Sequence, residues 1–157
     1  MAQLSSTQPS SAVVEVVERA LKSTNKFIKW SYSIQQAEQW LQERSFRAKL
    51  ALDITKAILK GKSLGIRLTH EEKQKAADIF ASNIFDCLDW LLATFETGVQ
   101  KDIDKLKVNL YRNLDIYIEA LFLLKKKVET SEDLQHYKDT VKLIQCCIDS
   151  LIKKLSS

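Results

Sequence analysis

The chain has 157 residues and a mass of 18.0 kDa; 45% of its residues are hydrophobic, 28% are charged, and only three are glycine and one proline. That length suits one domain of about 100–200 residues, and the balance of apolar and charged residues excludes a chain that is disordered throughout. Hairpins and sandwich corners depend on glycine and proline, so their scarcity nearly excludes an all-β fold. The net charge of +4 is far below that of a dedicated nucleic-acid binder.

The sequence predicts a cytoplasmic protein. Its N-terminus lacks the charged region and apolar run of a signal peptide, and no run of about 18 uncharged apolar residues could cross a membrane. The three cysteines, Cys87, Cys146 and Cys147, have no metal-binding spacing. Adjacent cysteines suit a disulfide badly, so all three are interpreted as small packing residues in a reducing compartment.

A polar segment precedes the first helical pattern. Residues 1–11 are rich in Ser and Gln and carry the only proline, which predicts a flexible tail, and residues 12–157 are expected to form a single helical-bundle domain. A first helix is predicted to end near residues 31–33, where Ser33 and Gln36 fit a capping box. No glycine or proline enforces that boundary, so the first two helices could be continuous.

Two further helices follow in the middle of the chain. The second is predicted over 34–60, with a possible kink at 43–47 and Gly61 at its end. The third should run from a capping box at Thr69 and Glu72 to Gly98. Its apolar residues cover roughly 240° of the helix surface, which places this helix at the centre of the fold. They are Ile79, Phe80, Ile84, Cys87, Leu88, Leu91, Leu92 and Phe95.

The last two helices show the most regular patterns. The fourth is predicted over 101–127, with a seven-residue repeat formed by Ile103, Leu106, Leu110, Asn113, Tyr117, Ala120 and Leu124. The fifth should begin at a cap on Thr130 or Ser131, and three-four spacing then links Leu134, Tyr137, Val141, Ile144, Ile148, Leu151 and Leu155. These lengths and short connections predict an all-α fold, a four- or five-helix up-and-down antiparallel bundle.

No motif for catalysis, metal binding or phosphate binding is complete. A Gly-Lys-Ser tripeptide begins at Gly61, but Lys56 occupies the position where a phosphate-binding loop needs its first glycine. With only two histidines, the chain is also far short of a di-metal ligand set. We therefore expect a protein that is not an enzyme and holds no cofactor.

An acidic face is predicted on the third helix, where Asp78, Asp86, Asp89 and Glu96 fall within about 80°. Residues 69–98 carry two basic and six acidic side chains, whereas residues 34–68 carry seven basic and three acidic ones. The acidic face could bind a basic protein. Alternatively, its charges could complement those of the neighbouring second helix.

A basic and aromatic face is predicted on the first two helices. Its members are Lys26, Lys29, Trp30, Trp40, Arg44 and Arg47. Cations interleaved with aromatic rings could bind a nucleic-acid backbone and stack its bases, or the tryptophans could line a pocket for a small anionic ligand. Alternatively, the aromatic rings are core or interface anchors and the cations are solvated.

Surplus apolar residues on the fourth helix suggest the function. Val108, Ile116, Ile118 and Phe122 exceed what one bundle seam needs, and a partner helix or a second copy of the chain would cover them. Two amides in apolar arcs, Asn83 and Asn113, are expected to bond each other. Alternatively, an amide at a seam position could fix register or association state, or point at a ligand. The favoured function is a non-enzymatic protein-interaction module, acting as a regulatory, adaptor or assembly subunit. A nucleic-acid-associated subunit and a small-ligand sensor are the alternatives.

Overall fold

The computed structural model describes residues 13, 15, 27–60, 69–98 and 102–157, and of residues 27–30 only the backbone. Within these ranges every regular element is helical and no strand occurs, which confirms the all-α class. The α-helices are α2 (Phe27–Leu41), α3 (Arg44–Leu59), α4 (His70–Thr97), α5 (Asp104–Leu110), α6 (Leu114–Thr130) and α7 (Lys138–Ser156). Two short 3₁₀ helices, η2 (Tyr111–Asn113) and η3 (Glu132–Leu134), lie between them. The predicted tail at 1–11 falls outside the described residues.

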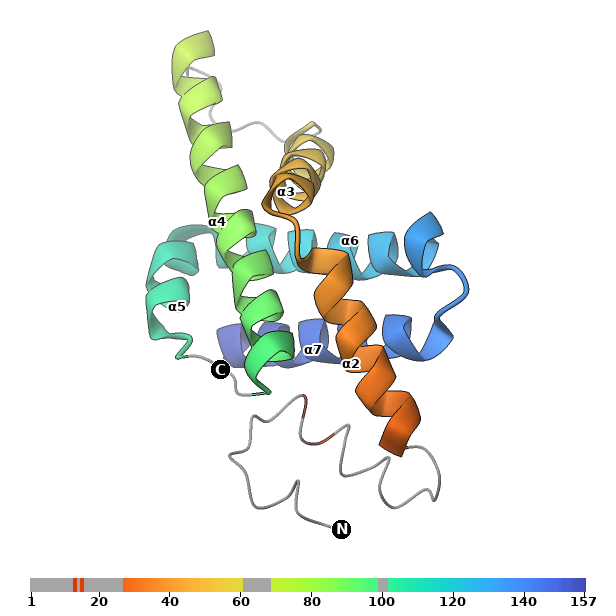
Figure 1. Ribbon diagram of the computed structural model, residues 1–157. Coiled ribbons are helices and arrows are strands. Elements are labelled where there is room, and N and C mark those ends of the chain that lie inside the picture. Colours follow the sequence, from red (N-terminus) through yellow and green to blue (C-terminus); the bar gives the residue numbers. More distant parts are fainter. Residues whose placement is uncertain (1–12, 14, 16–26, 61–68, 99–101) are drawn as a thin grey trace.

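The helices pack in crossing directions. α6 and α7 run antiparallel side by side, and α2 and α4 cross them steeply (Figure 1). α2 packs on both α7 and α4, while α3 packs on α4 and α6. Buried side chains from all six α-helices join one hydrophobic core, which also includes Val13 from the segment ahead of α2. The up-and-down order and the single domain over 12–157 remain predictions.

The boundary between the first two predicted helices lies elsewhere than expected. α2 continues through 31–33. The helix is interrupted at Gln42 and Glu43, at the edge of the kink predicted over 43–47. Ser33 does not cap a helix, because it lies inside α2. Its small side chain is buried, four residues before the buried Ala37. Small residues at that spacing let neighbouring helices approach closely, so Ser33 contributes to packing.

The third predicted helix is confirmed as α4. Thr69 Oγ1 accepts a hydrogen bond from the Glu72 backbone N–H, and the Glu72 carboxylate accepts one from the Thr69 N–H, as the capping box requires. The helix ends at Gly98, whose φ of 71° is the left-handed conformation that glycine adopts without strain. One member of the predicted apolar arc differs, because Ile79 is 56% exposed near the N-terminal end, where fewer helices cover α4.

The fourth predicted helix is not continuous. α5 ends at Leu110, and η2 turns the chain before α6 begins at Leu114. Asn113 ends this turn with the non-helical angles φ −129° and ψ 39°. Its side chain is exposed, so the predicted position in the apolar seam is wrong. The seven-residue repeat continues across this turn because α5 and α6 both bury apolar residues in the same core.

The fifth predicted helix begins later than expected. α6 extends to Thr130, so neither Thr130 nor Ser131 caps α7, and the reversal is made by η3. Leu134 is buried from this 3₁₀ turn, whereas Tyr137 precedes α7 and is exposed. Within α7, Leu143, Ile144, Cys147, Ile148, Leu151 and Leu155 are buried. The three-four pattern therefore identified the core face correctly but not the start of the helix.

Candidate functional site

The four predicted interface residues divide into two groups. Val108 is 74% exposed and Phe122 is 53% exposed, whereas Ile116 and Ile118 are only half-buried and Ile116 packs against the core. Tyr111, which sequence reasoning missed, is 79% exposed. Its position three residues after Val108 was a usable signal, since residues at that spacing share one helical face.

Phe122 lies in a groove between α3 and α6. The groove has a volume of about 740 Å³. Its lining residues come from α3 (Ala57 and Ile58), from α6 (Glu119, Phe122, Leu123, Lys125, Lys126 and Glu129) and from α7 (Gln145). We call this hollow the α3–α6 groove. It combines an exposed aromatic ring with charges of both signs, whereas small-molecule pockets are lined mainly by hydrophobic and aromatic side chains.

Polar contacts to α7 hold the groove wall beside Phe122. Lys125 Nζ lies 2.6 Å from Asp149 Oδ1 and 5.6 Å from the centre of the Phe122 ring. Gln145 Nε2 donates a hydrogen bond of 3.2 Å to the Lys125 carbonyl. A cation over an aromatic face attracts the ring, so these contacts restrict the positions that Phe122 can take.

The four predicted acidic residues do not act as one surface. Asp78 accepts a hydrogen bond from Gln74 at the exposed end of α4, and Glu96 is exposed near the other end. Asp86 and Asp89 line a pocket of about 330 Å³ between α4 and α5, together with Trp90, Asp102, Lys105, Leu106 and Asn109. Partial burial and the charge of Asp89 raise the pKa of Asp86, and Lys105 opposes that rise.

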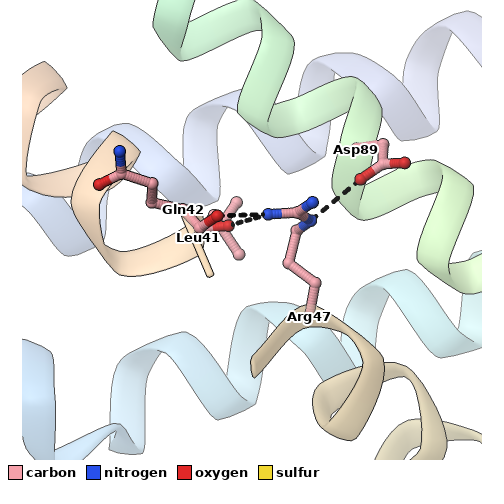
Figure 2. A network of polar contacts seen from close by, with 4 residues as sticks. All are labelled: Leu41, Gln42, Arg47 and Asp89. Carbon is pink, nitrogen blue, oxygen red and sulfur yellow. Dashed lines mark hydrogen bonds and ion pairs between the residues drawn. The ribbon is translucent and has the colours of Figure 1, made fainter. Parts of the chain in front are cut away.

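Arg47 joins three elements and is only 7% exposed (Figure 2). Its Nε donates to Asp89 Oδ1 at 2.9 Å. Its Nη1 donates to the carbonyls of Leu41 at 2.6 Å and Gln42 at 2.8 Å. Arg47 thereby satisfies backbone carbonyls that the end of α2 leaves without helical partners. The prediction that it belongs to an exposed basic face is wrong, and its pairing with Asp89 supports the alternative of charge complementarity between the two helices.

The remaining basic and aromatic residues are also dispersed. Lys26, and the side chains of Lys29 and Trp30, lie outside the described residues. The Arg44 guanidinium lies 5.1 Å from the centre of the Phe85 ring on α4. Trp40 packs edge-on against Phe46 with ring centres 5.3 Å apart, and its buried Nε1 has no acceptor within the described part of the chain. Trp40 and Trp90 line different pockets, so the described tryptophans do not share one ligand site.

The two amides do not bond each other. Asn83 Nδ2 donates to Tyr117 Oη at 2.8 Å, and Asn113 is exposed at the turn before α6. The Tyr117 ring stacks on Phe80 with ring centres 4.4 Å apart and planes inclined by 11°. Burial raises the pKa of Tyr117, and the bond from Asn83 partly offsets this effect. Sequence reasoning identified Asn83 as a buried amide with a partner but assigned it the wrong partner.

Two of the three thiols, Cys87 and Cys147, are packed in the core. Cys87 and Cys147 are buried, Cys146 is half-buried, and none of the three forms a disulfide. Burial raises the pKa of the Cys87 thiol to about 12, and it raises the pKa of Cys147 as well. A thiol that stays protonated is a poor nucleophile and a poor metal ligand. No group of three or more His, Cys, Asp or Glu side chains within the described ranges could hold a metal ion.

Comparison with known proteins gives no relative from which a function could be transferred. No protein family, curated protein or solved structure matches this chain. Across the described helices, none is both long enough and apolar enough to cross a membrane. The candidate site therefore depends on geometry alone, and its strongest element is the α3–α6 groove.

Proposed function

We propose that this chain is a non-enzymatic protein-interaction module, a regulatory, adaptor or assembly subunit that binds its partner through the α3–α6 groove. The observation that carries the proposal is the Phe122 ring, which is 53% exposed inside a groove of about 740 Å³. Exposing an aromatic ring to water forgoes the free energy that its burial would supply. Aromatic residues in pockets with a polar rim are typical centres of protein interfaces.

The rim of the groove supports a protein partner of mixed charge. Glu119 and Glu129 stand beside Lys125 and Lys126, so neither sign dominates the surface. A nucleic acid would require a surplus of cations, and Arg47, one of the two arginines of the predicted basic face, is bound to α2 and Asp89 instead. We therefore place the interaction at the groove.

Replacing Phe122 with Glu tests this function. The tagged full-length chain and its F122E variant are used to capture proteins from cells that naturally express the chain, and the retained proteins are compared by mass spectrometry. A matched co-expression with the untagged chain tests self-association in the same way. We expect at least one protein, the untagged chain included, to be retained by the wild type and lost by F122E. The helical circular dichroism should stay unchanged because Phe122 is exposed.

Val108→Glu provides the matched control, because Val108 is also an exposed apolar residue but does not line the groove. It should retain every protein that the wild type retains. Equal retention by wild type and F122E, or equal loss with V108E, would contradict the assignment of the groove as the docking surface.

A further inference from the structure

The groove face of α6 carries a pattern that is complementary to its own reverse. Glu119, Phe122, Leu123 and Lys126 all line the α3–α6 groove. At 100° per residue these four positions fall within about 100° of the helix surface. Along the chain they read acid, apolar, apolar, base. A second α6 running in the opposite direction therefore presents base, apolar, apolar, acid.

We propose that the occupant of the α3–α6 groove is α6 of a second copy of this chain, packed antiparallel about a twofold axis between Phe122 and Leu123. This inference rests on the proposed function, because it names the partner of that surface. In a twofold contact, residue i of one copy meets residue j of the other, and j meets i. Glu119 of each copy then faces Lys126 of the other, and each Phe122 faces Leu123.

The spacing of the residues along α6 and the lining of the groove are compatible with this packing. Glu119 and Lys126 are seven residues apart, about 10.5 Å along the helix axis, so the two charge pairs lie on either side of the apolar centre. Leu123 is half-buried in the groove, and α3 contributes the small Ala57 to its lining, which leaves room for an incoming phenyl ring. Of the two adjacent lysines, Lys125 is paired with Asp149, whereas Lys126 is exposed.

The charges favour a second copy over a partner of one sign. A strongly basic partner would meet Lys125 and Lys126, and a strongly acidic one would meet Glu119 and Glu129. Like charges brought together in an interface destabilise it. The reversed α6 pairs Glu119 with Lys126 on each side of the axis. The same axis places Asp115 opposite Thr130 and Glu129 opposite Ile116, so no two like charges meet.

Two charge-reversed variants and their mixture test the proposal. The full chain, Glu119→Lys and Lys126→Glu are each examined by sedimentation equilibrium at low salt, and the two variants are then mixed in equal amounts. The wild type should reach twice the 18.0 kDa chain mass as its concentration rises. Each single variant places like charges opposite each other twice, so its dissociation constant should rise at least about tenfold.

The mixture distinguishes the antiparallel arrangement from any other dimer. In the mixed dimer, the lysine introduced by E119K in one copy faces the glutamate introduced by K126E in the other, and the second pair is native. The mixture should therefore recover an affinity close to that of the wild type. Lys73→Glu and Glu96→Lys carry the same charge changes at exposed positions of α4, and neither they nor their mixture should alter the dimer. Circular dichroism checks that all variants are folded. If E119K is not folded, Glu119→Gln replaces it. Its mixture with K126E should then associate more tightly than K126E alone, because one native charge pair is restored and no like charges meet.

Three results would overturn the proposal. These are a wild-type chain that stays monomeric at high concentration, single variants that dimerise like the wild type, and a mixture that dissociates as readily as the single variants. In each case, the proposed function would still be supported if the capture experiment retained another protein with the wild type and lost it with F122E. If retention did not depend on Phe122, the proposed function itself would fail.

Discussion

At the scale of single residues, Arg47 shows how one side chain can join three elements. The break between α2 and α3 leaves the carbonyls of Leu41 and Gln42 without helical donors, and the Arg47 guanidinium supplies them. The Asp89 carboxylate from α4 accepts a hydrogen bond from Nε of the same guanidinium. Both Arg47 and Arg44 also lie over the Phe85 ring of α4. The position of α3 on α4 therefore depends on this cation.

Replacing Arg47 with Ala should lower the free energy of unfolding by about 2–4 kcal/mol, because it removes three charge-assisted hydrogen bonds at a buried position. Asp89→Asn should cost only about 1 kcal/mol, since the Asp89 side chain is partly exposed and both carbonyl bonds remain. Urea unfolding followed by circular dichroism measures both values. Equal losses in the two variants would mean that the carbonyl bonds contribute nothing.

Asp86 makes the stability depend on pH in the direction opposite to that of a salt-bridged acid. Burial and the nearby Asp89 raise the pKa of Asp86 above its ordinary value of 3.8. The folded chain therefore holds this proton more tightly than the unfolded chain, and the contribution of Asp86 to stability falls as the pH rises from 3.8 through the folded-state pKa.

Asp86→Asn should consequently raise the midpoint of thermal unfolding at pH 7, because an amide has no charge to desolvate and does not repel the Asp89 carboxylate. The advantage over the wild type should shrink as the pH approaches 3.8, where Asp86 is protonated in the folded state and increasingly so in the unfolded one. Melting curves between about pH 4 and pH 7 give the comparison. A difference that is constant across this range would show that charge is not its cause.

At the scale of elements, α4 is the helix whose ends are encoded most completely by local residues. Its N-terminus has a reciprocal capping box and acidic residues in the first turn that favour the helix dipole, and its C-terminus has a left-handed glycine. By contrast, α3 and α6 begin without a side-chain cap. The start of α3 is instead held by the tertiary contacts of Arg47 with Leu41, Gln42 and Asp89.

Thr69→Ala should therefore lower the free energy of unfolding by about 0.5–2 kcal/mol, the usual contribution of an N-cap hydroxyl. Ser82→Ala, which also removes a hydroxyl but at an exposed position inside the same helix, should be nearly neutral because Ala favours the helix interior. Denaturant unfolding of both variants tests the cap. A loss at Ser82 as large as that at Thr69 would contradict it.

At the scale of the whole molecule, adjacent residues of α6 have opposite roles. Leu121 is 1% exposed in the core between the crossing helices, and Phe122 faces the α3–α6 groove. Leu121→Ala should therefore cost about 2–5 kcal/mol through lost packing and a cavity, whereas Phe122→Ala should change stability by less than about 1 kcal/mol. Chemical unfolding at a concentration where the chain is monomeric separates these effects. Similar losses at both positions would show that Phe122 belongs to the core.

Local residue patterns were sufficient for the helical class and for α4. The scarcity of glycine and proline excludes most β architectures, and the Thr69–Glu72 box and Gly98 act within one turn of the chain, so the sequence alone locates both ends. The core faces of α6 and α7 were also predictable, because apolar periodicity reports which side of a helix avoids water.

The breaks and the partners were decided only by tertiary structure. No local signal separates the half-buried Ile118 from the exposed Phe122, directs Asn83 to Tyr117, or turns Arg47 inward to cap α2. Each of these outcomes depends on which helix lies opposite, and the sequence periodicity gives the buried side of a helix without giving its neighbour. The groove at Phe122 exists because α3 crosses α6 there, which is a property of the packed molecule and not of any one segment.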